Sequence, residues 1–252
     1  MRPTLMLLPG LMCDAAVWTH QRDALQFQAE CVVPVWGLCE SITAMAMQVL
    51  AVAPTEHFSL AGHSMGGRVA LEVLRLAPQR VERLALLDTG THALPAGEEG
   101  DQERTRRLAL LAMAQAQGMR AAGDRWARGM VHPQQIDTPL FESILAMLER
   151  SSPEQFCAQI HALLNRPDAG PLLPTIKCST LVLCGRDDVW SPPAQHAAMR
   201  AAIAGAQLCV IDCCGHMSTM EQPHAVNEAL REWLTSVPHL AVRKSGIHLS
   251  VD

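Results

Sequence analysis

The first 90 residues alternate between short apolar runs and segments whose apolar residues recur at helical intervals, and this alternation constrains the fold more than any other feature. The apolar runs lie at 3–10, 29–37, 57–64 and 81–90, and helical spacing follows the first three at 15–25, 42–53 and 65–77. Strands that alternate with helices in this way pair in parallel and are joined by right-handed crossovers. The pattern predicts an α/β fold in which a mostly parallel sheet carries helices on both faces.

The alternation stops between residues 91 and 175, where no convincing strand occurs. Helical patterns occupy this stretch at 103–119, 140–151 and 153–164, which is more chain than a single crossover needs. Strand–helix alternation then resumes. We therefore expect an α/β core built from residues 1–90 and 176–237, a helical cap or lid inserted at 91–175, and a C-terminal tail at 238–252 to which the sequence assigns no role.

Composition narrows the class of protein. The 252 residues, of which 49% are hydrophobic, suffice for one full core but not for two enzyme-sized domains. A formal charge of −5 without a basic run argues against a nucleic-acid partner. No apolar stretch is long enough to span a bilayer, and the first ten residues do not resemble a signal peptide. We expect a soluble cytoplasmic protein without nucleic-acid or membrane partners, and the sequence leaves a homodimer open.

The nine cysteines do not form a metal or redox motif. They are scattered, apart from one adjacent pair, and no C-x-x-C spacing occurs. An odd number of cysteines in a chain without a signal peptide is typical of reduced thiols packed as small hydrophobic residues. The sequence therefore predicts neither disulfides nor a metal site.

The pentapeptide GHSMG, residues 62–66, lies between an apolar run and an amphipathic helical pattern. A serine on a tight strand-to-helix turn needs small neighbours, and Gly62 and Gly66 stand two residues to either side of Ser64. Such a turn lifts the hydroxyl clear of the sheet at a helix N-terminus, where free N–H groups favour negative charge. Ser64 is thus the candidate nucleophile, with an incidental serine in a glycine-rich turn as the alternative.

A serine hydroxyl needs a base, and the chain offers eleven histidines. His216 stands out because it follows the last apolar run, in the position of a base that comes last in the order Ser…Asp…His. His63, beside the nucleophile, is expected to point away from it. The acid that orients the base should follow a late strand, and the residues alone leave Asp187, Asp188 and Asp88 as candidates.

Four segments give the chain a resemblance to the α/β-hydrolase superfamily, in its lid-bearing esterase and enol-lactonase-like branch. They are LLPGLMCDAAVW, LAGHSMGG, LVLCGRDDVWSPP and CCGHMSTMEQP, and the similarity extends over residues 4–233. The family pattern G-x-x-D-x-x-x-P fits Gly185, Asp188 and Pro192, so the resemblance selects Asp188 as the acid. Glycine before His216, with Glu221 and Pro223 after it, matches as well.

The resemblance also implies where an oxyanion would be stabilised. One donor should be the backbone N–H of Met65, the residue after the nucleophile, and the other that of Leu11 in the loop after the first strand. Relatives usually carry His-Gly in this loop, whereas this chain has Pro9-Gly10. Because the chain opens directly on the strand that leads to this loop, the resemblance implies a shortened sheet of about six strands.

These residues together suggest a serine hydrolase that cleaves a small or medium carboxylic ester, lactone or thioester through an acyl-enzyme, with no metal or organic cofactor. Cap helices rich in Leu, Met and Ala suggest an apolar pocket, for which Trp126, Met130, Phe141 and Met147 are candidate lining residues. Core packing is the alternative for each. A C–C bond hydrolase, a cofactor-free perhydrolase, an acyltransferase and a non-enzymatic small-molecule binder remain alternative functions, because a fold does not determine a substrate.

Overall fold

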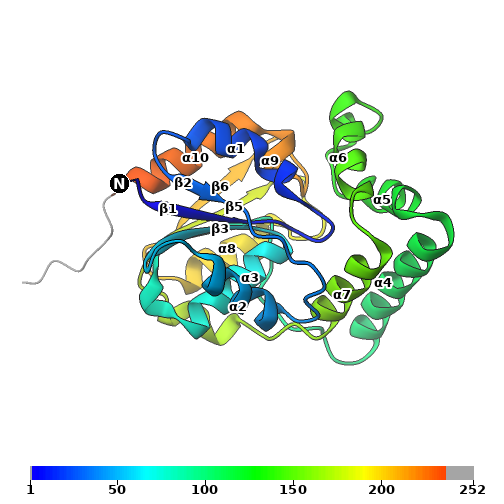
Figure 1. Ribbon diagram of the computed structural model, residues 1–252, viewed down its shortest axis with the longest axis horizontal. Helices are drawn as coiled ribbons and strands as arrows, with labels where there is room; N and C mark the ends of the chain where they lie inside the picture. The colour runs from blue at the N-terminus through cyan, green and yellow to red at the C-terminus, as the bar shows by residue number, and fades with distance from the viewer. Residues whose placement is uncertain (1, 237–252) are drawn as a thin grey trace, which may run out of the picture.

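A six-stranded sheet forms the centre of the computed structural model, which describes residues 2–236 (Figure 1). Every neighbouring pair of strands is parallel, and the strand order is β2-β1-β3-β4-β5-β6. The strands are β1 (Thr4–Leu8), β2 (Glu30–Val32), β3 (Phe58–His63), β4 (Val81–Leu87), β5 (Ser179–Gly185) and β6 (Gln207–Ile211). The predicted parallel α/β sheet of about six strands is confirmed.

Helices cover both faces of the sheet, which explains why the central strands read as continuous apolar runs. All residues of β1 and β3 are buried. Figure 1 shows helices packed against both faces of the sheet. One face carries α1 (Thr19–Leu25) and α10 (Pro223–Thr235), and the other carries α2 (Ile42–Val52), α3 (Met65–Leu76) and α8 (Pro193–Ala202).

Four helices between β4 and β5 form a lobe to one side of the sheet, drawn in green in Figure 1. They are α4 (Glu98–Gln117), α5 (Met119–Ala127), α6 (Pro139–Glu149) and α7 (Pro153–Leu164). The sequence pattern predicts three helices here and runs the first to residue 119. In the structure the first helix ends before Gly118, whose φ of 90° lies in the left-handed region that favours glycine, and α5 begins at the next residue.

Short helices complete the described part of the chain. They are η1 (Ala15–Trp18), η2 (Pro78–Arg80), η3 (Pro133–Gln135), η4 (Gly170–Thr175) and α9 (Ser218–Glu221). The predicted helix over 15–25 is therefore a 3₁₀ turn followed by α1. Ser41 caps α2 as expected, because its hydroxyl accepts from the N–H of Ala44. None of the helices within residues 2–236 is long and apolar enough to cross a membrane.

The strand order reverses direction next to β1, and this reversal positions the site. From β1 the chain moves outward to β2, then returns to β3 on the other side of β1 and continues in the opposite direction. In open α/β sheets, ligands bind outside the carboxyl ends of the strands at such a switch point. The loop after β1 and the turn after β3, which carry the predicted oxyanion loop and Ser64, leave the sheet at this crevice. The predicted tail at 238–252 lies outside the described residues.

Candidate active site

Ser64 occupies a sharp turn between β3 and α3. Its φ of 55° and ψ of −115° are unusual for a residue with a side chain. Two hydrogen bonds hold its backbone: the Ser64 N–H donates to the carbonyl of Leu87 at 2.9 Å, and the hydroxyl of Thr89 donates to the Ser64 carbonyl at 2.6 Å. Both partners come from the end of β4, so the neighbouring strand fixes the turn.

The glycines on either side of Ser64 are required by close backbone contacts. A Cβ added at Gly62 would lie 2.3 Å from the carbonyl oxygen of Gly66, and a Cβ added at Gly66 would lie 2.1 Å from that of Leu8. Neither position has room for a side chain. The crowding that the sequence predicts for this turn therefore comes from α3 packing tightly against the ends of β1 and β3.

Three polar side chains that are far apart in the sequence form a hydrogen-bonded chain at the carboxyl edge of the sheet. The Nε2 atom of His216 lies 2.8 Å from the hydroxyl oxygen of Ser64, and its Nδ1 atom lies 2.8 Å from an Asp188 carboxylate oxygen. Both His216 and Asp188 are buried, whereas Ser64 is partly exposed. The structure thus brings together the three side chains that the sequence nominates.

The Asp188 carboxylate is held as an anion by its surroundings. Its second oxygen accepts from the backbone N–H groups of Trp190 and Ser191, each at 2.9 Å. Burial alone would raise the pKa of Asp188, but the charge of His216 and these hydrogen bonds outweigh it and lower the pKa to about 2. For His216, burial disfavours the charged form, yet the charge and hydrogen bond of Asp188 raise its pKa above the usual value.

The other two candidate acids face elsewhere. An Asp187 carboxylate oxygen lies 3.3 Å from the N–H of Cys214 and 3.8 Å from a ring nitrogen of His132. Asp88 is fully buried and accepts hydrogen bonds from the N–H of Gly185, at 3.1 Å, and from the hydroxyl of Ser218. Burial, followed by the nearby Asp188 charge, raises the pKa of Asp88 well above its ordinary range. Neither carboxylate bonds to the His216 ring.

His63, next to the nucleophile, supports the backbone rather than the hydroxyl. Its Nε2 atom lies 2.8 Å from the backbone carbonyl oxygen of His216 and 3.7 Å from Asp88. Burial, reinforced by the charge of His216, lowers the pKa of His63 to about 4, so the ring is neutral near pH 7. A neutral His63 donates to that carbonyl through its Nε2–H and thereby fixes the loop that carries His216.

The loop after β1 and the start of α3 each bring one unpaired N–H group to the nucleophile. Leu11 and Met65 both line the cavity around Ser64, and within residues 2–236 neither backbone N–H donates a hydrogen bond. Buried Trp36 donates its ring N–H to the carbonyl of Pro9 at 3.1 Å, and the side chain of Gln159 accepts from the N–H of Met12 at 2.8 Å. Sequence reasoning missed both supports, because nothing in the local pattern marks a buried tryptophan or glutamine as a partner of a distant loop.

The loop that carries His216 is held from the helical lobe. The His216 N–H donates to the carbonyl of Met130 at 2.6 Å. Buried Glu221 accepts from the N–H groups of Gly215, Met217 and His132 at 3.1, 3.0 and 2.7 Å. A Cβ at Gly215 would lie 2.4 Å from the Met130 carbonyl oxygen. The segment after α5 and the loop after β6 therefore pack as one unit around the base.

A cavity of about 650 Å³ opens in front of Ser64 and His216, within the size range typical of small-molecule sites. Of the four residues that the sequence nominates for a pocket, Trp126 lines this cavity. Met130, Phe141 and Met147 do not line it and are buried in the hydrophobic core instead. Large apolar residues on a helix face satisfy either environment, so the sequence pattern could not separate them.

The wall of the cavity differs from the apolar pocket that the sequence suggests. On one side the Trp190 ring, from the loop after β5, lies 5.5 Å from the His216 ring and 5.1 Å from Trp126 of α5, measured between centroids. On the other side the wall contains four arginines, Arg68, Arg106, Arg107 and Arg166, together with Glu99 and Glu103. The cavity is therefore partly aromatic and partly charged.

The arrangement can perform one kind of chemistry well. A hydroxyl bonded to an imidazole, which is bonded in turn to a buried carboxylate, is an activated nucleophile. Two free backbone N–H groups beside that hydroxyl can receive developing negative charge on a carbonyl oxygen. Within residues 2–236 no group of three or more His, Cys, Asp or Glu side chains is placed to hold a metal ion.

Comparisons with known proteins show the family and agree with the fold. The sequence profile of a family described as the alpha/beta hydrolase family matches residues 5–229. Among solved structures, a thermophilic esterase from Thermogutta terrifontis, determined with malate bound, is similar with a TM-score of 0.81 and 28% identity, over 92% of this chain and 90% of that chain.

Two curated proteins illustrate the chemical range among the relatives. A Klebsiella pneumoniae protein with the provisional name carbamate hydrolase RutD is 24% identical over 251 residues, which cover 93% of this chain and 92% of the relative. The 2-hydroxy-6-oxononadienedioate/2-hydroxy-6-oxononatrienedioate hydrolase of Escherichia coli K12 is 28% identical over 179 residues, covering 69% of this chain and 61% of the relative. Both are hydrolases by name, and their substrates differ.

Proposed function

Because this chain belongs to the alpha/beta hydrolase family, we propose that it is a serine hydrolase that cleaves small or medium carboxylic esters, with lactones and thioesters as related substrates. The observation that carries the proposal is the hydrogen-bonded chain from Ser64 through His216 to Asp188, with 2.8 Å at each step. The esterase from Thermogutta terrifontis, similar over most of both chains, supports the ester class.

In the proposed reaction, the Ser64 hydroxyl oxygen attacks the acyl carbon while His216 Nε2 takes its proton. Asp188 holds the ring with Nδ1–H toward the carboxylate and stabilises the imidazolium that forms. The N–H groups of Leu11 and Met65 donate to the oxyanion. His216 then gives its proton to the departing alkoxide, which leaves an ester between the acyl group and Ser64.

Water completes the cycle. His216, neutral again, takes a proton from a water molecule that attacks the acyl-enzyme, and the second tetrahedral intermediate collapses to release the acid and the Ser64 hydroxyl. Every proton that leaves a nucleophile is returned to a leaving group by the same imidazole. The proposed cycle needs no metal or organic cofactor.

A panel of p-nitrophenyl esters, from acetate through butyrate and hexanoate to octanoate, tests this proposal. We expect turnover with a preference among chain lengths, and a loss on the order of 10⁴-fold or more in kcat for Ser64→Ala and for His216→Ala. Ser143→Ala, at an exposed serine of α6, and His20→Ala, at an exposed histidine of α1, are matched controls that should keep full activity. Activity that survives in Ser64→Ala would overturn the proposal.

One second candidate has a specific observation in its favour. The Escherichia coli relative is named for hydrolysis of an oxo-dioate rather than an ester, and it is 28% identical over 69% of this chain. Hydrolysis of a C–C bond next to a ketone would use the same cavity and the same three side chains. If the ester panel gives only slow turnover, ketone substrates with an adjacent cleavable C–C bond are the next to assay. A cytoplasmic location remains a prediction for cell fractionation.

A further inference from the structure

The cavity in front of Ser64 carries more positive than negative side chains. Four arginines and two glutamates line it, as named above. An ester without charge needs no such wall, and a guanidinium that faces a cavity without a partner is costly to keep there. The pairing of each arginine therefore shows where an anionic ligand could bind.

Two of the four arginines are already paired within the wall. Glu103 receives two hydrogen bonds from Arg166, at 2.8 and 2.9 Å, and one from Arg107 at 2.8 Å. Arg166 also donates to the backbone carbonyls of His92 and Leu163, and its side chain is only 6% exposed. One carboxylate thus serves two guanidinium groups, which leaves this part of the wall with a net positive charge.

Arg68 has an unfilled set of donors and is, of the four cavity arginines, the one that follows the nucleophile most closely in the chain. It lies near the start of α3, four residues after Ser64 at the N-cap, and both residues line the same cavity. Its side chain donates to the carbonyl of His92 at 2.8 Å, and within the described residues it forms no ion pair. The remaining guanidinium N–H groups have no protein acceptor within residues 2–236.

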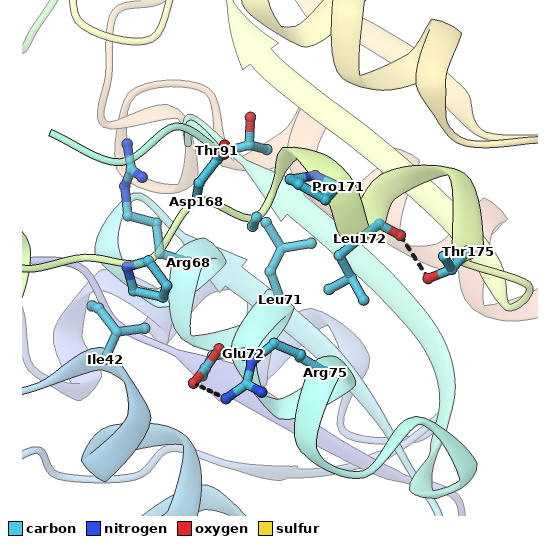
Figure 2. Close-up of a pocket in the computed structure, with 12 residues that line it drawn as sticks. Ile42, Arg68, Leu71, Glu72, Arg75, Thr91, Asp168, Pro171, Leu172 and Thr175 are labelled. Carbon is cyan, nitrogen blue, oxygen red and sulfur yellow. Dashed lines mark hydrogen bonds and ion pairs between the residues drawn. The ribbon is translucent and has the colours of Figure 1, made fainter. Parts of the chain in front are cut away.

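The charges around Arg68 leave it in need of an anion. Burial and the neighbouring Arg166 and Arg107 lower the pKa of Arg68 to about 9, while Glu103 and Asp168 act in the opposite direction. Arg68 also lines a second, smaller cavity of about 270 Å³, shown in Figure 2 together with Asp168. Glu72, four residues after Arg68 on α3, also lines that cavity. Its carboxylate accepts a hydrogen bond from Arg75 at 2.7 Å, as the dashed line in Figure 2 marks.

Helix α4 adds a second cation at the rim. Its residues at positions 99, 103, 106, 107 and 110 share one face and all line the cavity. On this face Arg106 is exposed and forms no ion pair within the described part of the chain. Exposed Glu99, one turn before Glu103, is the acidic neighbour on the same face. Arg68 and Arg106 are therefore the two cavity arginines without a carboxylate partner.

We propose that Arg68, with Arg106 at the rim, binds a carboxylate carried by the substrate, so that the ester cleaved at Ser64 is an anionic one such as a half-ester of a dicarboxylic acid. The cleavage step in this inference rests on the proposed function, whereas the binding of the carboxylate by Arg68 does not. The planar fork of a guanidinium matches the two oxygens of a carboxylate. The cavity, at about 650 Å³, accommodates such a ligand between Ser64 and the arginines.

The test compares two esters of the same length that differ in one end group: monomethyl glutarate, which ends in a carboxylate, and methyl pentanoate, which ends in a methyl group. Methanol release gives kcat and KM for each. We expect the wild-type protein to prefer the anionic ester, and Arg68→Gln to reduce the ratio of the two kcat/KM values roughly 10- to 100-fold, mainly through KM. Arg104→Gln, at an exposed arginine of α4 outside both cavities, should leave the ratio unchanged.

Binding without turnover separates this inference from the proposed function. Calorimetry with monomethyl glutarate should show binding to the Ser64→Ala protein. Adding Arg68→Gln to that protein should weaken the binding roughly 10- to 100-fold, as expected for the ratio of kcat/KM values. If neither ester is hydrolysed but this binding is seen, the proposed function fails and the inference stands. If both esters are hydrolysed with a ratio that Arg68→Gln does not change, the inference is overturned and the proposed function stands. Arg68→Lys, which keeps the charge, replaces Arg68→Gln if circular dichroism shows the latter unfolded, and it should lose part of the preference.

Discussion

At the scale of single residues, the site depends on a backbone conformation that serine rarely adopts. Ser64 has a positive φ of 55°, and Asp88 at the end of the next strand has one of 48°. Residues in such regions cost about 1–3 kcal/mol each and persist where the surroundings hold them in place. Here the bonds from Ser64 to Leu87 and from Thr89 to Ser64 do so. The strain at Ser64 thus coincides with the residue whose chemistry the proposal needs.

The two buried aspartates near His216 give a direct comparison at this scale. Asp188→Asn removes the charge that orients and stabilises the imidazolium, and we expect kcat on a p-nitrophenyl ester to fall on the order of 10³- to 10⁴-fold. Asp88→Asn should change kcat less than about tenfold, because an asparagine oxygen can still accept from Gly185 and its amide can donate to Ser218. Steady-state kinetics on both proteins, with thermal melts as the control for folding, checks this.

An equal loss in the two variants at equal stability would mean that the acid has been assigned to the wrong strand. The geometry argues against that outcome. Asp188 lies 2.8 Å from His216 Nδ1, whereas Asp88 reaches only the ring of His63, at 3.7 Å. The apolar runs left both open, since each aspartate follows one, and only the resemblance to the family pattern selected Asp188.

The pH dependence of kcat/KM follows from the pKa of His216. The Asp188 charge raises that pKa above 6.5, although burial opposes it. Because only the neutral imidazole can take the proton of Ser64, kcat/KM should rise with pH and reach half its maximum above pH 6.5. In Asp188→Asn the opposing burial remains without the charge, so the residual activity should reach half its maximum at a lower pH. A midpoint that moves upward in this variant would contradict the assignment.

At the scale of elements, the loop after β6 depends on the segment after α5, which lies more than 80 residues earlier in the chain. The carbonyl of Met130 and the carboxylate of Glu221 hold the backbone of residues 215–217 from two sides. Any displacement of the segment after α5 would therefore move the His216 ring relative to Ser64. The lobe acts as part of the support for the base as well as a wall of the cavity.

Glu221→Gln tests that support. One of the two side-chain oxygens becomes an NH₂ group that cannot accept, so at least one of the N–H groups of Gly215, Met217 and His132 loses its partner. We expect a loss of about 1–3 kcal/mol in the free energy of unfolding, together with a fall in kcat that exceeds any change in KM. Urea unfolding and steady-state kinetics measure the two effects.

Glu228→Gln, at an exposed position of α10, is the matched control and should affect neither quantity. A Glu221→Gln protein with normal stability and normal kcat would show that the carboxylate does not hold the loop.

Local sequence patterns predicted the elements and the three central side chains but not their supports. Strands, most helices and the positions of Ser64 and His216 follow from short-range features: apolar periodicity, a glycine-flanked turn, and strand ends. Strand ends left three aspartates as candidates, and the resemblance to the family pattern selected Asp188. Trp36 and Gln159 act through contacts between distant segments, as Glu221 does toward His132, and no local pattern records a partner 27, 89 or 147 residues away. The sequence also did not predict that arginines line the cavity, because a charged residue on a helix is usually exposed to solvent.

At the scale of the whole molecule, one sheet edge collects every group in the proposed mechanism. The loop after β1, the turn after β3, the loop after β5 and the loop after β6 contribute the Leu11 N–H, Ser64, Asp188 and His216 respectively. The carboxyl ends of parallel strands lie at the same edge of a sheet, so the loops that follow the strands of this six-stranded sheet meet there although they are far apart in the sequence. The helical lobe then closes one side through Trp126 and Trp190, whose rings lie 5.1 Å apart.

The most direct test of the account is covalent labelling of the intact protein by a fluorophosphonate, followed by mass spectrometry of the peptides. We expect one equivalent of label on Ser64, none in Ser64→Ala, and labelling slowed on the order of 10³-fold or more in His216→Ala, because the imidazole activates the hydroxyl. Label on another residue, or an undiminished labelling rate in His216→Ala, would show that Ser64 is not a nucleophile activated by His216.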